Sequence, residues 1–325
     1  MMRATARFIL AAAVFGLMAS MTLPAQAASR TWVSGTSGND ANPCTRALPC
    51  ATFAAAYTAT DAFGEINCID AGSFGVLTIQ KSITISCEAG TAGILAPLDN
   101  GITVNMLATD VVYLRGLDIN GLGPNPLSRV GIAMFSPGTL HVEKCLIHGF
   151  VGSNSSFQGF GILAQPNGTG ALFVADTVVT DNGTAANGGN IIIEPTSSSV
   201  VNVSLERVQM TNGTVGLRAD GTDASPLRVS VTDSQASGNI YNGFFAKTTN
   251  GKVTMMIQHS IAANNGANGA RADGALAKLV LGESVISGNV TGVSTANGGT
   301  LLSYQDNRID LNGTDGWPVT SLALH

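Results

Sequence analysis

The sequence predicts an all-β solenoid, a stack of coils in which each coil consists of three short strands and three turns. A motif that ends in Asn recurs every 23 to 30 residues, and short apolar segments that alternate with period two fill the space between the motifs. Gly and Asn punctuate these segments. A unit of this length built from short strands leaves no room for a helix in every repeat.

Composition agrees with this fold class and excludes others. Of 325 residues, 39 are Gly and 24 are Asn, while only 11% are charged, against about 25% in an average domain. Such a chain is neither a coiled coil nor a helical bundle, and a hydrophobic fraction of 45% argues against disorder. A formal net charge of −5 is a poor match for nucleic acid as a partner.

The first 27 residues have the pattern of a secretory signal peptide. Arg3 and Arg7 precede an apolar run over 8–23, and Ala25-Gln26-Ala27 supplies a small-x-small cleavage signal. The alternative, a membrane anchor, is disfavoured because the run is short and no charged stop-transfer segment follows it. We therefore expect a secreted or periplasmic protein that is cut near Ala27 and has no membrane anchor when mature.

The next segment, residues 28–65, is expected to close the first coil. It contains Cys44 and Cys50 on either side of a short loop, and export permits disulfides. Cys68 and Cys87 lie in two apolar segments that would stack as neighbouring strands. We predict the pairs Cys44–Cys50 and Cys68–Cys87, although four cysteines allow three pairings. Cys145 is left over, and a small buried thiol explains it better than a reactive one.

The coils are expected over residues 66–313, and residues 314–325, with Trp317, are expected to close the far end. In each repeat an acidic or polar residue, a small residue and Val or Ile precede the Asn. Asn tolerates the left-handed backbone of a tight corner, and amides on successive coils can hydrogen-bond each other. The sequence thus predicts a ladder formed by Asn182, Asn212, Asn239, Asn265, Asn289 and Asn312.

These repeats resemble the right-handed parallel β-helix of the pectate lyase-like superfamily, in which an Asn ladder occupies a tight turn. The segment 32–40, followed by an expected short helix over 52–60 and the segment 64–75, is similar to the capping entry of secreted bacterial β-helix proteins. Such a helix seals the open end of the core. The superfamily includes polysaccharide lyases, glycoside hydrolases, adhesins and phage tailspikes, so the resemblance implies the fold and not one activity.

One candidate site follows from aligning three coils after the Asn corner. If the small and apolar residues point inward, two columns face solvent: Arg218, Phe245 and Arg271 as ligand-binding residues, and Asp220, Lys247 and Asp273 beside them. Asp220 and Asp273 would be about 9–10 Å apart, close to the separation of about 6.5–9.5 Å in inverting glycosidases. The alternative is a surface network of ion pairs that only solubilises the sheet.

A second candidate is a column of acids at another corner. Asp176, Glu206 and Asp233 on consecutive coils have oxygen ligands suitable for Ca²⁺, the one cofactor that the sequence brings into consideration. The alternative is that these acids are simply solvated. Pectate lyases combine calcium-binding acids with an Arg base in a groove between long loops, a pattern that the short C-terminal coils do not match.

Three functional classes remain for a protein expected to be a monomer. Binding of a polysaccharide or a cell-surface glycan fits the short loops and the low charge. A polysaccharide lyase or glycoside hydrolase is the first alternative, and a structural envelope protein is the second. His141, His148, His259 and His325 are scattered without a Ser or Cys partner, so no catalytic triad is predicted.

Overall fold

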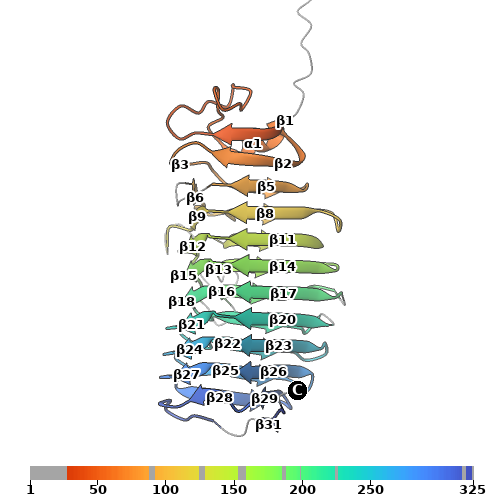
Figure 1. The fold of residues 1–325 in the computed structure, drawn as a ribbon, viewed down its shortest axis with the longest axis vertical. Coiled ribbons are helices and arrows are strands. Elements are labelled where there is room, and N and C mark those ends of the chain that lie inside the picture. Colours follow the sequence, from red (N-terminus) through yellow and green to blue (C-terminus); the bar gives the residue numbers. More distant parts are fainter. Residues whose placement is uncertain are drawn as a thin grey trace, which may run out of the picture.

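The computed structural model describes residues 28–316, apart from 88–91, 124–128, 153–158, 185–187, 198 and 224–225, together with residues 320–323. In this part of the chain the strands form a right-handed parallel β-helix, so the predicted fold class is confirmed (Figure 1). The predicted signal peptide, Trp317 and His325 lie outside the described residues. Among the described residues there is no helix long and apolar enough to cross a membrane.

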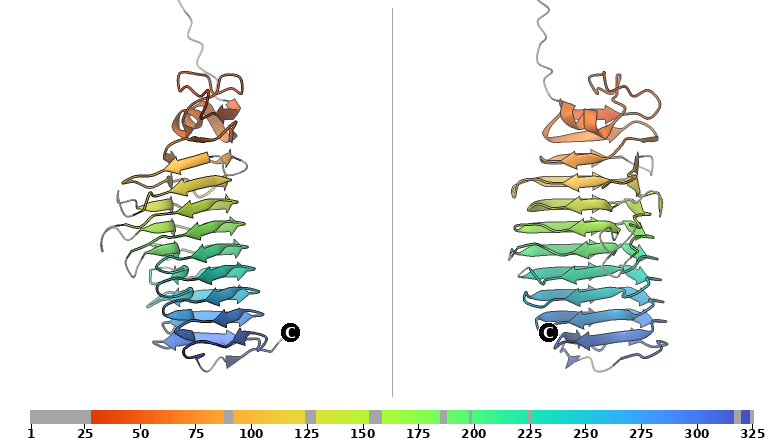
Figure 2. Two further views of the ribbon diagram at one scale, coloured as in Figure 1. Left: turned by 90° about the vertical axis from the view of Figure 1, so that its left-hand side faces the viewer. Right: turned by 180° about the vertical axis from the view of Figure 1, so that it is seen from behind.

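Three parallel sheets run the length of the molecule, and each coil contributes one strand to each sheet in turn (Figures 1 and 2). We call them sheets A, B and C, with 12, 10 and 9 strands among the described residues. Sheet A consists of β1 (Ala28–Val33), β2 (Thr60–Cys68), β5 (Ile83–Ser86), β8 (Val111–Arg115), β11 (Gly138–Glu143), β14 (Gly170–Ala175), β17 (Val201–Glu206), β20 (Leu227–Thr232), β23 (Val253–Gln258), β26 (Ala277–Gly282), β29 (Thr300–Ser303) and β31 (Thr320–Ser321).

The strands of the other two sheets are shorter. Sheet B consists of β3 (Gly72–Ser73), β6 (Ala92–Leu95), β9 (Leu117–Asn120), β12 (Leu146–His148), β15 (Val178–Thr180), β18 (Gln209–Thr211), β21 (Gln235–Ser237), β24 (Ile261–Ala263), β27 (Val285–Ser287) and β30 (Arg308–Ile309). Sheet C consists of β4 (Leu77–Ile79), β7 (Ile102–Val104), β10 (Val130–Met134), β13 (Phe160–Ala164), β16 (Gly189–Ile193), β19 (Leu217–Asp220), β22 (Phe244–Lys247), β25 (Asn268–Asp273) and β28 (Thr291–Ala296).

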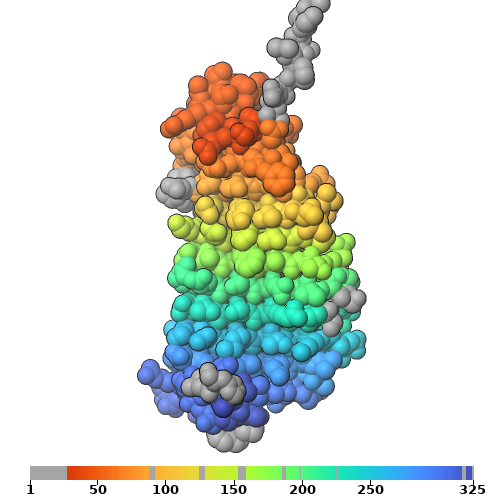
Figure 3. Space-filling model, turned by 45° about the vertical axis from the view of Figure 1, so that its right-hand side comes forward, coloured from red at the N-terminus to blue at the C-terminus, as the bar shows by residue number. Residues whose placement is uncertain are grey.

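Inward-facing side chains from all three sheets form one continuous core. Alternation along each strand produces it: in β14, Leu172 and Val174 are 1% exposed, whereas Phe173 between them is 39% exposed. The coils stack without a visible gap on the face seen in Figure 3. Residues that share a position in successive coils therefore form a column along the surface.

The expected short helix is present as α1 (Phe53–Ala59), next to β1 and β2. The Thr52 side chain caps it by accepting a hydrogen bond from Ala55 N–H. Phe53 and Ala56 are buried, and the Phe53 ring lies 5.1 Å from that of Phe74. The helix thus covers the apolar end of the first coils, as a solenoid cap must.

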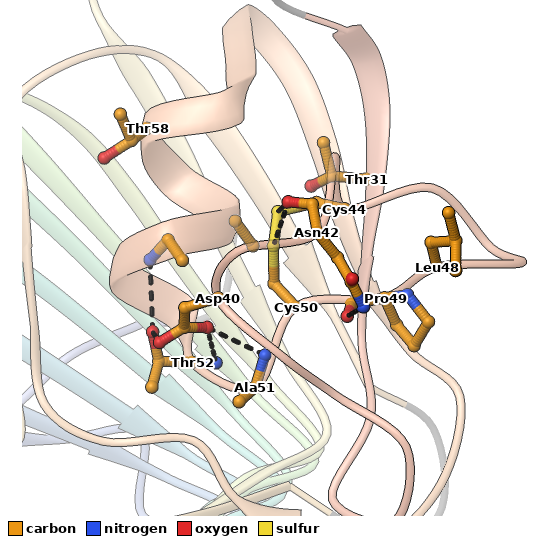
Figure 4. The surroundings of a disulfide bond; sticks show 12 residues. Thr31, Asp40, Asn42, Cys44, Leu48, Pro49, Cys50, Ala51, Thr52 and Thr58 are labelled. Atoms are coloured by element: carbon orange, nitrogen blue, oxygen red, sulfur yellow. Dashed lines mark hydrogen bonds between the residues drawn. A yellow bond between two sulfur atoms is a disulfide. The ribbon is translucent and has the colours of Figure 1, made fainter.

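Both predicted disulfides are present. Cys44–Cys50 closes the loop beside α1, where Asp40 accepts hydrogen bonds from Ala51 N–H, Thr52 N–H and the Thr52 hydroxyl (Figure 4). Cys68–Cys87 joins β2 to the end of β5. The bonds therefore tie the cap to the first coils.

Cys145 is a buried free cysteine, and burial raises the pKa of its thiol to about 12. Its backbone N–H donates to Thr177 Oγ1 in the next coil. In later coils Ser234, Ser260 and Ser284 accept a backbone N–H in the same way, so these small polar residues close the corner between sheets A and B. Cys145 is a structural member of this column.

The corner between sheets B and C holds the Asn ladder. The amide of Asn239 donates to Asn265 Oδ1 at 2.9 Å, Asn265 to Asn289 at 2.8 Å, and Asn289 to Asn312 at 2.9 Å. Each of these accepting oxygens also takes the backbone N–H of the preceding ladder residue. The ladder therefore satisfies backbone and side-chain groups that burial would otherwise leave unpaired.

The prediction that Asn212 belongs to the ladder is wrong by one residue. Asn212 is exposed with φ +54°, and its N–H donates to Ser237 O, which aligns it with Gly238 and not with Asn239. Gly213 takes the ladder position. Asn190, from the start of β16, fills the vacant place by accepting from the Asn182 amide and donating to Asn239 Oδ1, both at 3.0 Å. A Cβ on Gly213 would meet the Asn190 side chain at 2.5–2.8 Å.

Replacing one ladder residue should therefore destabilise the protein far more than replacing Asn212. Asn265→Ala removes the acceptor of two N–H groups in a buried corner, and we expect it to lower the free energy of unfolding by about 1–3 kcal/mol. Asn212→Gly keeps the left-handed backbone and should change it by less than about 0.5 kcal/mol. Urea denaturation followed by circular dichroism measures both, and equal losses would contradict this assignment of the ladder.

Candidate functional site

The two columns predicted on sheet C are present in the expected register. Arg218 pairs with Phe245, which pairs with Arg271, and Asp220 pairs with Lys247, which pairs with Asp273. The intervening residues point inward and are at most 1% exposed: Leu217, Ala219, Phe244, Ala246, Ala270 and Ala272. The alignment of these three coils from the sequence is therefore confirmed.

The charged groups of these columns pair with one another. Lys247 Nζ lies 2.9 Å from Asp220 Oδ2, and Arg271 Nη2 lies 2.8 Å from Asp273 Oδ2. The Arg271 guanidinium lies over the Phe245 ring at 5.6 Å from its centroid. Lys247 stands in the coil between the two aspartates, so an ammonium separates the carboxylates that the sequence placed as a candidate catalytic pair. This arrangement matches the ion-pair alternative for these three coils.

Two further residues extend the second column and were not identified from the sequence. Glu194 and Gln165 follow β16 and β13, and Glu194 Oε1 accepts a hydrogen bond of 2.7 Å from the Gln165 amide. Glu194 Oε2 lies 2.8 Å from Arg218 Nη2, whose side chain is only 5% exposed. The signal that marks Glu194 is its place directly after Ile191-Ile192-Ile193, but the long segment between Asn182 and β16 obscured this register.

These side chains surround a shallow depression with a volume of about 280 Å³ at the ends of the sheet C strands. Its lining comprises Gln165, Glu194, Pro195, Thr196, Asp220, Thr222, Asp223 and Lys247. Burial by itself raises the pKa of Asp220, but hydrogen bonds from Thr222 and Lys247, together with the Lys247 charge, outweigh burial and lower the pKa. Asp220 is therefore a carboxylate at neutral pH.

The candidate calcium column is organised differently from the prediction. Arg207, with φ +52°, occupies the corner position in register with Asp176 and Asp233, and Glu206 lies one residue earlier, on β17. The Arg207 guanidinium lies 2.6 Å from Asp176 Oδ1 and also contacts Glu206, and its hydrogen bonds lower the pKa of Asp176. No set of three or more His, Cys, Asp or Glu side chains within the described ranges is arranged to hold a metal ion. Whether Ca²⁺ binds here stays an open prediction.

Sheet A carries a second cluster that was not identified from the sequence, a stack of three aromatic rings on its outer face. Tyr113, His141 and Phe173 pair in register on β8, β11 and β14. The ring centroids are 4.3 Å apart between Tyr113 and His141 and 4.7 Å apart between His141 and Phe173, each pair with an interplanar angle of 13°. Burial lowers the pKa of His141, so the imidazole is neutral at pH 7.

The column changes from aromatic to small after Phe173. Ser204 pairs with Phe173, and Ser230 pairs with Ser204 in the next coil. Beside these serines lies a groove of about 420 Å³, lined by Asn202, Val203, Pro226, Arg228, Val229, Ser230, Lys252 and Thr254. Its lining has two cationic side chains and no acidic one.

Comparison with known proteins identifies the fold and no family. No protein-family model matches the chain, and no curated protein sequence matches it. The crystal structure of pectate lyase Pel9A is similar with a TM-score of 0.57 and 14% identity, over 85% of this chain and 80% of that one. Tailspike protein 2 of the Escherichia coli O157:H7 bacteriophage CAB120 aligns at 14% identity and a TM-score of 0.35, over 75% of this chain and 37% of the tailspike. At 14% identity the similarity to the lyase shows a shared right-handed parallel β-helix.

Asp220 should contribute stability that depends on pH. Its pKa is lower in the folded state, so its ionised form stabilises the fold above the unfolded pKa of about 3.9, and this contribution is lost as the pH falls through the folded pKa. We expect Asp220→Asn to cost about 1–3 kcal/mol at pH 7 and progressively less below about pH 4. The exposed Asp233, changed to Asn, is the control. Thermal unfolding between pH 2 and pH 7 tests this, and a difference between Asp220→Asn and the parent protein that is independent of pH would contradict it.

Proposed function

We propose that this protein is a secreted or periplasmic carbohydrate-binding protein and that sheet A binds a segment of an acidic polysaccharide. The observation that carries the proposal is the aromatic stack, because it ends beside the groove. The predicted signal peptide and the two disulfides support export to an oxidising compartment. The proposal for the bound sugar depends on the geometry of Phe173 and of the basic groove.

Phe173 offers an aromatic face to a ligand. His141 stacks on one face of its ring, so the opposite face is directed toward the next coil, where Ser204 stands in register. A serine side chain is too short to cover a phenyl ring, and Phe173 is 39% exposed. The apolar C–H face of a sugar ring packs well against such a surface, because aromatic rings combine a large apolar area with a negative face.

The groove supplies the polar contacts and selects the charge. Arg228 and Lys252 provide charged donors, while Asn202, Ser230 and Thr254 provide an amide and two hydroxyls. A guanidinium binds a carboxylate or sulfate in a planar, bidentate manner. A positive groove on a chain of net charge −5 therefore favours an acidic sugar. The name of pectate lyase Pel9A indicates a polysaccharide ligand for one protein of this fold.

The lining favours binding over cleavage. It includes no Asp, Glu or His, which are the usual general acids of glycoside hydrolysis. A lyase or hydrolase is accordingly the alternative, and formation of unsaturated or reducing-end products would establish it. For the third class, a structural envelope protein, no particular contact in the molecule speaks.

An array of acidic and neutral glycans, incubated with protein starting at residue 28 in the presence and absence of Ca²⁺, tests the proposal. We expect oligogalacturonate or another acidic glycan to bind, with Phe173→Ala weakening the affinity about tenfold, since a stacked aromatic contributes about 1 kcal/mol beyond its buried area. Arg228→Gln should weaken binding and reduce its dependence on salt.

Phe63→Ala is the matched control, because Phe63 is 81% exposed and lies on β2, away from the groove. Calorimetry on the parent protein and the three variants gives the affinities. The proposal fails if no acidic glycan binds, or if Phe173→Ala and Arg228→Gln bind as the parent protein does.

A further inference from the structure

We propose that the depression on sheet C is a second and independent site that binds a neutral sugar unit. It lies at the ends of β13, β16, β19 and β22, on a different sheet from the aromatic stack and the basic groove. Its chemistry differs from that of the groove in three respects: a fixed hydrogen-bond network, a buried guanidinium beneath it and an excess of carboxylates.

The polar groups of the depression are held in place before any ligand arrives. Glu194 accepts hydrogen bonds from Gln165 at 2.7 Å and from Arg218 at 2.8 Å. Asp220 accepts from the Thr222 hydroxyl at 2.6 Å and from Lys247 at 2.9 Å. Carboxylate oxygens and an ammonium have capacity for further bonds. Sugar hydroxyls, which both donate and accept, match such a mixture of fixed acceptors and donors.

Arg218 shows that this part of the column is more than an exposed ion-pair network. Its side chain is 5% exposed, and its Nε has no hydrogen-bond partner. Exposed ion pairs contribute little and need no burial, whereas a buried guanidinium incurs a desolvation cost that Glu194 must offset. The pair between Arg218 and Glu194 therefore fixes the Glu194 carboxylate at the edge of the depression.

Charge and shape select the ligand. Glu194, Asp220 and Asp223 outnumber Lys247 in the lining, and with Arg218 beneath them the local charge is still negative, so an acidic sugar is repelled. Phe135 precedes Gln165 in the same column and is 37% exposed, which places an aromatic surface next to the polar groups. The volume of about 280 Å³ is at the small end of ligand sites and suits one sugar ring of a neutral chain.

Calorimetric titration with hexaoses of glucose, mannose, galactose and xylose, and with oligogalacturonate, tests this inference. We expect at least one neutral hexaose to bind. Glu194→Gln and Lys247→Met should weaken that affinity at least tenfold. Lys278→Met, the same change at an exposed lysine on β26, should leave it unchanged, and so should Phe173→Ala on sheet A.

Several outcomes overturn the inference. It fails if no neutral hexaose binds at millimolar concentration, if both charge variants bind as the parent protein does, or if oligogalacturonate binding is what these variants abolish. Should both variants prove unfolded by circular dichroism, Phe135→Ala decides: its exposed ring can be removed without opening the core, and unchanged hexaose binding then overturns the site. Because Phe173→Ala tests sheet A alone, failure of one site is distinguishable from failure of the other.

Discussion

The backbone hydrogen bonding between successive coils is the constraint on which the rest of this structure depends. Each strand pairs in parallel with the equivalent strand of the coil before and the coil after, so every coil must return the chain to the same place after 23 to 30 residues. Sharp corners make this return possible, and a corner buries polar groups that need partners. The Asn ladder and the column of Thr177, Ser234, Ser260 and Ser284 supply those partners one coil at a time.

The same constraint turns residue positions into surface columns. A side chain repeated at one position stacks on itself at the strand spacing of about 4.8 Å, which is why Tyr113, His141 and Phe173 form a continuous aromatic stack. Where the column changes residue type, the surface changes shape: the stack ends at Ser204, and the sheet C column passes from Gln165 to charged residues. The two proposed sites lie at such changes, and their opposite charge suits different sugars.

The sequence predicted the register only where the coils have nearly equal length. From Gly213 onward the coils differ by one to three residues, and the pairing of Arg218 with Phe245 and of Phe245 with Arg271 followed from counting. Between Asn182 and β16 an irregular segment breaks the count. The consequences are the misplaced Asn212, the assignment of Glu206 to a corner that Arg207 occupies, and the omission of Glu194.

By itself the sequence determined the fold class, the capping helix, both disulfides and the buried ladder, because each rests on local chemistry that repeats: turn residues, alternation and cysteine placement. Tertiary structure alone decided which amide fills the ladder beside Gly213 and which cation sits beneath Glu194. It also decided that the aromatic stack ends beside a basic groove. These features depend on which residues of different coils come into register, and one inserted residue in a single coil shifts every later position to the next column.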